Sequence, residues 1–329
     1  MNYLLIDLAN TFSRARFSAH KQADIATKIG FAIHVTLSSV AKCWREQSAD
    51  HVVFFNEGRS WRKSYYVPYK ANRAVTKAAY NPKEKEEDGL FWESLNDLQT
   101  YLQTKTNCTV LQHPELEADD LIAGWIQNHP SDNHTIISTD SDFHQLLADN
   151  VNQYNGVSEE LYTIHGIFDR LNRRIIDKKT KLPKAIPDPP WILFEKCMRG
   201  DTSDNIFSAY PGVRTKGTKK KVGLQEAYED RNIKGFNWNN LMLQVWTDHL
   251  DKQHRVLDDY HRNVVLVDLS AQPPEIRTII DTTVKEVVQL SRPMVGVHFL
   301  KFCGKFDLVK MAEMSTQFIP FLEAKYQHG

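Results

Sequence analysis

The sequence predicts an α/β fold with a central, mainly parallel sheet flanked by helices. Short apolar runs alternate with longer helical patterns through the first half of the chain, as in proteins built from strand–helix–strand units. Acidic residues follow these runs where the strands would end, and functional groups of parallel sheets collect there. A third observation, 41% apolar residues in a chain of 329, allows a sizeable core without disulfide bonds.

Four strands are expected, each as a short run of buried residues. They are Tyr3–Leu8, His51–Phe55, Thr109–Gln112 and His134–Ser138. Helical apolar spacing covers Ile25–Trp44 and Leu90–Thr104, and a further helix opens at the ELEADD run and continues through Ile126. A basic connection at about Arg170–Pro190 is typical of a linker, and the residues beyond it are expected to be largely helical.

The composition predicts a soluble, reduced protein. The four cysteines are scattered without disulfide or zinc-site spacing, so we expect interior thiols at Cys43, Cys108, Cys197 and Cys303. No apolar run approaches the roughly 20 residues of a membrane span, and the first residues lack the basic start of a signal peptide. We therefore expect a cytoplasmic protein.

Basic residues are concentrated although the chain carries 41 Lys plus Arg and 41 Asp plus Glu. Residues 58–83 contain no acidic residue and hold seven cations, Arg59, Arg62, Lys63, Lys70, Arg73, Lys77 and Lys83. A second basic run consists of Arg214, Lys216, Lys219, Lys220 and Lys221. Such segregation allows phosphate-binding surfaces and a metal-binding pocket in one neutral chain.

Eight carboxylates are candidates for a metal site: Asp7, Glu117, Asp119, Asp120, Asp140, Asp142, Asp201 and Asp204. Two carboxylates about 6 Å apart repel by roughly 3 kcal/mol at an effective dielectric constant near 20, so such a cluster needs cations. Oxygen ligands without His or Cys suit Mg²⁺, or Mn²⁺ as its substitute, better than Zn²⁺. Two such ions are the usual apparatus of phosphodiester hydrolysis.

Helix capping is the competing interpretation of these residues. Asp is a preferred N-cap residue, and the TDSD and GDTSDN runs are typical of turns that open helices. Each position taken singly fits both interpretations. The repetition of ExDD, DxD and DxxD where strands end or helices begin favours the metal site.

Several runs occur in the order found in one family. They are LLIDLANTFSR, VVFFNEGRSWRKSYYVPYKANR, ELEADDLIAGWI, IISTDSDFHQLL, RGDTSDNIFSAYPGV and HRNVVLVDL. In this order the sequence resembles the phage 5′-nucleases, which include flap endonucleases, 5′-3′ exonucleases and phage RNase H. The resemblance implies a PIN-like fold in three regions: an α/β nuclease domain at 1–186 with a helical arch at about 58–90, a helix-turn-helix type duplex-binding region at 187–270, and a C-terminal helical region at 271–329.

The resemblance also implies roles for individual residues. A first metal site would use Asp7, Glu117 and Asp119, and a second Asp140, Asp142, Asp201 and Asp204, with Asp119 or Asp120 between them. The implied catalytic residues are Lys70, Arg73, Asp119 and Asp140, because the cations of the YKxNR motif approach the scissile phosphate. The implied nucleic-acid-binding residues are Arg62, Lys63, Tyr69, Lys70, Arg73, Gly212, Arg214, Lys216, Lys219 and Lys220.

The role of the arch tyrosines, Tyr65, Tyr66 and Tyr69, stays open between two interpretations. Their rings could stack on unpaired bases as a single strand passes. They could equally pack the arch on the domain.

Two positions depart from the family pattern. The turn PGVRTKGTKKKVG alters the expected glycine spacing, which argues against the K⁺ ion that some relatives bind there. Asn56 stands where the family places an Asp that helps to hold the first metal, so that site should bind more weakly unless Glu57 or a water substitutes.

The expected function is a structure-selective 5′ nuclease that removes RNA primers or 5′ flaps by a two-metal mechanism in phage DNA replication. Its substrate would be DNA or an RNA/DNA duplex with a free 5′ strand, and we expect a monomer. The amphipathic stretches beyond residue 270 could contact a single-strand-binding protein, although helix packing explains them equally well. The alternatives are a DNA-junction-binding protein with weak or lost cleavage, because of Asn56, and a PIN-type ribonuclease, which shares the acidic core but gives no reason for the arch.

Overall fold

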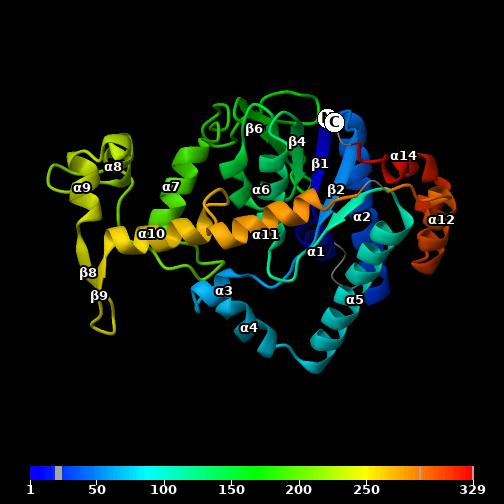
Figure 1. Cartoon of the computed structure of the whole chain (residues 1–329), viewed down its shortest axis with the longest axis horizontal. Coiled ribbons are helices and arrows are strands. Elements are labelled where there is room, and N and C mark those ends of the chain that lie inside the picture. The colour runs from blue at the N-terminus through cyan, green and yellow to red at the C-terminus, as the bar shows by residue number, and fades with distance from the viewer. Residues whose placement is uncertain (19–23, 289, 328–329) are drawn as a thin grey trace. The chain divides into compact units, whose positions relative to one another are not determined.

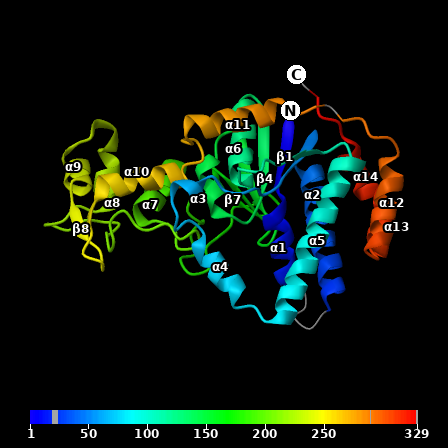
Figure 2. The same cartoon turned by 60° about the horizontal axis from the view of Figure 1, so that its bottom comes forward.

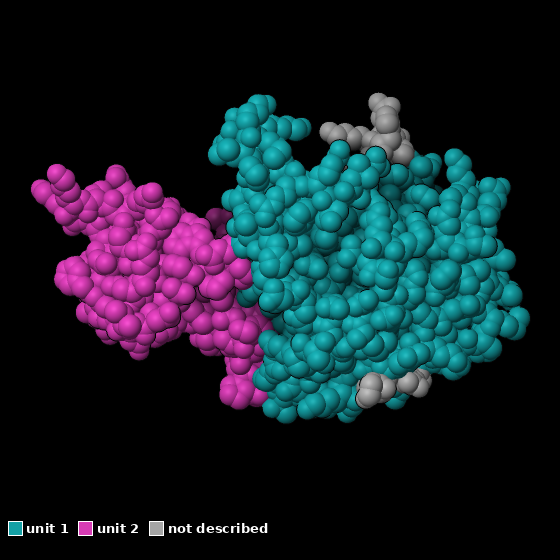
Figure 3. All heavy atoms as spheres, turned by 90° about the horizontal axis from the view of Figure 1, so that it is seen from above, with its two compact units in different colours: residues 1–60, 80–187, 277–329 teal, residues 61–79, 188–276 magenta. Residues whose placement is uncertain are grey.

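A computed structural model describes the chain in three stretches, residues 1–18, 24–288 and 290–327. The chain divides into two compact units, drawn in different colours in Figure 3. Unit 1 consists of residues 1–60, 80–187 and 277–329, and unit 2 of residues 61–79 and 188–276.

Unit 1 is built on a seven-stranded sheet of order β3-β2-β1-β4-β5-β6-β7. The strands are β1 (Asn2–Asp7), β2 (His51–Phe55), β3 (Thr109–Leu111), β4 (Asn133–Ile137), β5 (Val151–Asn155), β6 (Glu160–Thr163) and β7 (Gly166–Phe168). The first five run parallel, and β6 and β7 form antiparallel pairs at one edge. The mainly parallel α/β sheet predicted from the sequence is confirmed, with β2 at its predicted bounds.

Helices cover both faces of this sheet (Figures 1 and 2). Those of unit 1 are α1 (Leu8–Ser18), α2 (Ile25–Glu46), α5 (Pro82–Lys105), α6 (Ala118–Asn128), η1 (Ser141–Leu146), α11 (Pro274–Lys285), which enters the unit at Arg277, α12 (Val295–Lys305), α13 (Val309–Glu313), η3 (Ser315–Gln317) and α14 (Ile319–Glu323). On one face Leu4 and Phe54 join a core with α1, α2 and α5. On the other face Tyr3 and Phe55 meet Trp125 of α6.

Helix α5 begins at Pro82, earlier than the predicted Leu90. The Asn81 side chain accepts a hydrogen bond from the Glu84 N–H, and the Glu84 side chain accepts one from the Asn81 N–H. This capping box, with Pro82 in the first turn, starts the helix inside the charged KEKEED run, where apolar periodicity gives no signal.

The described residues from Arg277 onward pack within unit 1 and do not form a unit of their own. Phe299 of α12 and Phe321 of α14 are fully buried in the core that also contains α2 and α5. On the opposite face Gly124 of α6 lies so close to Ile280 of α11 that an added Cβ would meet its Cγ2 at 2.1 Å. The C-terminal helices therefore complete both faces of the sheet.

Unit 2 is mainly helical. It contains α3 (Arg62–Tyr65), α4 (Ala71–Ala78), α7 (Pro189–Arg199), α8 (Leu224–Glu229), η2 (Arg231–Ile233), α9 (Phe236–Met242), α10 (Val256–Val267) and a hairpin of β8 (Val245–Thr247) and β9 (Gln253–Arg255). Phe194, Leu224 and Trp238 lie in its core. The GDTSDN run is a turn closed by the pairing of Asp201 with Ile206, and it does not open a helix, as the capping interpretation had expected it to.

Two expectations from composition can be compared with the structure. All four cysteines are buried and free, as expected for interior thiols. Within the described part of the chain, none of the helices has the length and apolar character that crossing a membrane requires.

Candidate metal centre and nucleic-acid surface

The carboxyl ends of three neighbouring strands define the candidate metal centre in unit 1. β1 ends at Asp7, β2 is followed by Asn56 and β4 is followed by Ser138. In the parallel register Asp7 is opposite Phe55 and Ile6 is opposite Ile137, so the three positions are neighbours across the sheet. Adjacent strands lie about 4.8 Å apart, which brings these side chains to one edge.

Asp7 is buried and fixed at both oxygens. Its side chain is only 4% exposed. Oδ2 accepts a hydrogen bond from Ser138 Oγ at 3.0 Å, and Oδ1 accepts one from the Asn10 N–H at 3.1 Å. A carboxylate held in this way has a fixed orientation and still has lone pairs for a metal ion.

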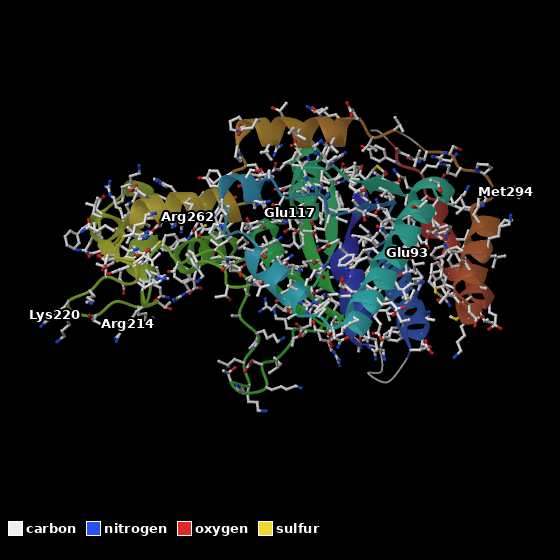
Figure 4. The ribbon with its side chains drawn as sticks, turned by 90° about the horizontal axis from the view of Figure 1, so that it is seen from below. Glu93, Glu117, Arg214, Lys220, Arg262 and Met294 are labelled. Carbon is white, nitrogen blue, oxygen red and sulfur yellow. The ribbon has the colours of Figure 1, made fainter. Side chains whose placement is uncertain are left out.

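The start of α6 supplies the next acidic residues. Glu117, labelled in Figure 4, is 4% exposed, and its Oε2 accepts a hydrogen bond from Ser60 Oγ at 2.8 Å. Asp120 is fully buried, and its Oδ2 accepts a hydrogen bond from the Glu117 N–H at 3.2 Å. Asp120 therefore caps the first turn of α6, as the competing interpretation expected, whereas Asp119 between them is half-buried.

The TDSD run forms a tight turn after β4. Asp140 Oδ1 accepts a hydrogen bond from the Asp142 N–H at 2.9 Å, and the Asp140 N–H donates to Ser138 Oγ at 3.1 Å. Gln153 Nε2, from β5, donates to the carbonyls of Ser138 and Asp140 at 3.0 and 2.7 Å. Asp140 thus caps η1, but a carboxylate can accept this bond and also bind a metal.

Asn56 is an uncharged residue among the candidate metal ligands at the carboxyl ends of the strands. It is 4% exposed, and its backbone N–H donates to the Leu111 carbonyl at 3.0 Å. Among the described residues, nothing accepts a hydrogen bond from its Nδ2. A buried donor left without a partner costs about 1–3 kcal/mol, so the amide is poorly suited to this place. Glu57 is exposed, and its Oε2 accepts a long bond of 3.4 Å from the Ala118 N–H.

The donors gathered in unit 1 fit a hard divalent cation, because they are all oxygens. They are Asp7, Asn56, Glu117, Asp119, Asp140 and Asp142. Carboxylate and amide oxygens are what Mg²⁺ and Mn²⁺ prefer. The other two predicted ligands, Asp201 and Asp204, belong to unit 2, so the predicted second metal site stays a prediction.

In unit 2 the GDTSDN turn is joined to the predicted arch residues. Asp204 binds three side chains: Tyr69 OH at 3.1 Å, Lys70 Nζ at 3.6 Å and Arg73 Nη2 at 2.9 Å. The Lys70 N–H also donates to the Asp204 carbonyl at 2.8 Å. Two cations of the YKxNR motif therefore share one carboxylate.

Asp201 forms an ion pair with Lys196. Lys196 Nζ lies 2.6 Å from its Oδ2, and the Ser203 hydroxyl donates to Oδ1 at 2.6 Å. Burial alone would raise the pKa of Asp201, but these two partners outweigh it and lower the pKa to about 2. Asp201 therefore carries its charge at neutral pH.

Two predicted nucleic-acid contacts do not fit the structure. Arg62 is 2% exposed and its Nε donates to the Leu266 carbonyl at 2.8 Å, so it is buried where we predicted phosphate contact. Tyr69 is 4% exposed and packs in unit 2 with Ile206 and Leu266, which agrees with the packing alternative and not with base stacking. Tyr65 is half-exposed and Lys63 is exposed.

The second basic run remains at the surface of unit 2. Its cations are exposed between α7 and α8, and Figure 4 shows Arg214 and Lys220 extending outward from this loop. Gly212, beside it, has a φ of +71°, in the left-handed region that favours glycine.

Comparison with known proteins decides the family. The model of the 5′-3′ exonuclease N-terminal, resolvase-like domain matches residues 2–172, about half of the chain. The chain belongs to this family. The family resemblance found in the sequence is therefore confirmed. The predicted class of enzyme is confirmed with it: a metal-dependent nuclease that hydrolyses phosphodiester bonds.

Relatives of this nuclease include phage and bacterial proteins. It is 26% identical over 274 residues to the flap endonuclease of Escherichia phage T5, covering 82% of this chain and 83% of that protein. It is 25% identical over 290 residues to a 5′-3′ exonuclease of Buchnera aphidicola, covering 86% and 84%. A solved T5 flap endonuclease complex with DNA and metal ions shares the fold, with a TM-score of 0.57 at 21% identity over 95% of this chain and 100% of that one.

The structure of this nuclease also shows site residues that the sequence analysis missed. Ser138 and Ser60 hydrogen-bond the predicted ligands Asp7 and Glu117. Gln153 holds the TDSD turn from β5. Only Ser138 had a signal in the sequence, its place between a strand end and the TDSD run.

Proposed function

We propose that this nuclease is structure-selective and cuts DNA, or an RNA strand paired with DNA, near a free 5′ end. Its role would be removal of primers or flaps during phage DNA replication. The observation that carries the proposal is the oxygen-only edge of unit 1, where Asp7, Glu117 and Asp140 are oriented by hydrogen bonds. The phage T5 relative and its solved complex with DNA support the substrate class.

The residues of unit 1 prepare the site for two Mg²⁺ ions. When bound, such ions would activate a water and stabilise the charge that develops on the phosphate. Asp7 and Glu117 would hold one ion and Asp140 and Asp142 would contribute to the other. The hydroxyls of Ser138 and Ser60 keep the carboxylates of Asp7 and Glu117 from rotating. Such contacts matter because removing a hydrogen-bond partner of a metal ligand typically lowers metal affinity or activity about 10- to 100-fold.

A flap assay tests the proposal. A labelled 5′-flap duplex and an RNA–DNA duplex are incubated with the protein and Mg²⁺, and short 5′ products are expected. Asp140→Asn should lower the cleavage rate by more than about 100-fold, beyond the effect of removing a ligand's partner, while duplex binding survives. The matched control is Asp149→Asn, at a side chain that is 87% exposed. Cleavage by Asp140→Asn near the wild-type rate would refute the metal assignment.

A second candidate function is favoured by Asn56. Its buried amide removes one charge from the metal centre, as expected for a DNA-junction-binding protein whose cleavage has weakened. Calorimetric titration with Mg²⁺ separates the two candidates. A two-metal nuclease shows two binding events, one of them lost in Asp7→Asn, whereas a binding protein with an impaired first site shows one event that survives this substitution.

A further inference from the structure

The loop between α7 and α8 in unit 2 has a defined shape despite its charge. We call residues 213–223 the lysine loop. Its cations, all exposed, are Arg214, Lys216, Lys219, Lys220 and Lys221, and it contains no acidic residue. Five like charges in so short a segment repel one another, so an ordered loop needs internal contacts that offset this repulsion.

Glu226 supplies such contacts from α8. Its two carboxylate oxygens accept the Gly217 N–H, each at 3.0 Å, and Oε2 also accepts the Gly223 N–H at 2.9 Å. One side chain thus ties both ends of residues 217–223 together. Burial would raise the pKa of Glu226, but its own N–H and those of Gly217 and Gly223 outweigh this and lower it, so the carboxylate is charged.

The backbone segments that meet around Glu226 leave no room for side chains at Gly217 and Gly223. A Cβ on Gly217 would lie 2.6 Å from the Lys221 carbonyl oxygen, and one on Gly223 would lie 2.4 Å from the Gly217 nitrogen. Between them Thr218 and Lys221 exchange backbone hydrogen bonds of 2.7 and 3.3 Å. This turn places Lys219 and Lys220 at its tip.

The lysine loop also borders a hollow of unit 2. A pocket of about 670 Å³ is lined by Gly212, Arg214, Lys216, Lys220, Asn240 and Gln244, among others. It offers cations and amide groups and no carboxylate side chain among its lining residues. A concave surface of this chemistry suits backbone phosphates, which are bound by charge and N–H donors without reading the bases.

We propose that Glu226 is a positioning residue for DNA binding: it holds the cations of the lysine loop in the arrangement that contacts the duplex backbone. The inference rests on the proposed function, because it assumes a duplex substrate. It assigns a role to an acidic residue inside a basic surface, where charge alone would make it harmful to binding.

The direction in which Glu226→Gln changes the DNA affinity distinguishes a positioning role from a purely electrostatic effect. Glu226→Gln removes a negative charge beside a phosphate-binding surface, so charge alone predicts tighter binding. A positioning role predicts weaker binding, because in either orientation the amide places its NH₂ donor against the Gly217 N–H, and its neutral oxygen accepts more weakly than a carboxylate. We expect affinity to fall about tenfold, and the slope of log K against log salt to lose about 1 to 2 units as phosphate contacts are lost.

The experiment uses the full chain and a labelled 5′-flap duplex in EDTA, so that binding is measured without cleavage. Fluorescence anisotropy at several NaCl concentrations gives the affinity and its salt slope for wild type, Glu226→Gln and Glu229→Gln. Glu229 is an exposed acidic residue at the end of the same helix, so its substitution removes the same charge away from the loop. Binding by Glu226→Gln as tight as wild type or tighter overturns the inference, as does equal weakening in both variants.

Hydrogen exchange keeps the inference testable if the variant folds poorly. In the wild-type chain the Gly217 and Gly223 amides should exchange slowly, because a charged acceptor holds both. Unprotected exchange at these amides refutes the inference whatever the variants do. If wild type binds no duplex, the proposed function fails, and the exchange measurement still decides whether Glu226 organises the loop.

Discussion

Replacing Asn56 by Asp tests the metal centre at a candidate ligand position that carries no charge. Asn56 follows β2 and neighbours Asp7 at the end of β1, and both side chains are 4% exposed. The variant restores a carboxylate at this edge. Its effect on stability should depend on whether a divalent cation is present, because the new charge is repelled by Asp7 and attracted by the ion.

The magnitude follows from charge repulsion. Two carboxylates about 6 Å apart repel by about 3 kcal/mol at an effective dielectric constant near 20. Removing the partnerless Nδ2 donor returns about 1 kcal/mol or more, equally with and without metal. Mg²⁺ should therefore stabilise Asn56→Asp by about 3 kcal/mol more than wild type. For a domain of some 150 to 250 residues, this is about 6–12 °C in melting temperature.

Thermal unfolding in EDTA and in excess Mg²⁺, followed by circular dichroism, measures this difference. Asn133→Asp is the control, because Asn133 is exposed at the amino end of β4, the opposite end of the strands. Flap cleavage by Asn56→Asp should also reach half its maximum at lower Mg²⁺. Equal Mg²⁺ shifts in wild type and Asn56→Asp would show that Asn56 is not beside a bound ion, and the assignment would fall.

Three further outcomes are expected. Gly124→Ala should destabilise unit 1 by about 1–3 kcal/mol in urea unfolding, because its Cβ would meet Ile280 Cγ2 at 2.1 Å, and an unchanged midpoint would contradict the packing of α11 on α6. Burial lowers the pKa of His51 to about 4, although the Ala324 carbonyl accepts a hydrogen bond from its Nδ1 at 3.1 Å. The unfolded chain, with a pKa near 6.5, then binds a proton that the folded chain does not. Stability should fall between about pH 6.5 and 4 by up to about 1.4 kcal/mol per pH unit, and His51→Gln should flatten this slope; an equal slope would refute it. Exchanging K⁺ for Na⁺ at constant ionic strength should leave duplex affinity within about twofold, since counterion release depends on ionic strength and Glu226 closes the lysine loop; a larger loss would point to a bound K⁺.

The parallel half of the sheet could be predicted because its strands are buried on both faces. β2 consists of His51 followed by four apolar residues, all buried, and was predicted at its observed bounds. β5, β6 and β7 were not predicted. These strands are only three to five residues long and show neither a continuous apolar run nor a regular alternation. Their antiparallel pairing depends on contacts between strands that the local sequence pattern does not contain.

The acidic edge could be predicted for a related reason, since parallel strands bring their carboxyl ends together. Asp7 and the TDSD run were placed at strand ends, where the structure has them. The hydroxyl partners could not be found, because Ser138 lies 131 residues from Asp7 and Ser60 lies 57 residues from Glu117. The burial of Arg62 was missed for the same reason, since its acceptor, Leu266, is 204 residues away.

The ion pairs of Asp204 also set an order of events during synthesis. Arg73 and Asp204 are 131 residues apart, and helix α4 has eight residues and buries none. An isolated helix of this length is marginal in water. At a translation rate of about 5–20 residues per second, the YKANR segment would wait roughly 7–26 seconds before Asp204 is made. A ribosome-bound chain ending before residue 204 should therefore expose this segment to protease, and a chain extended past α10 should protect it.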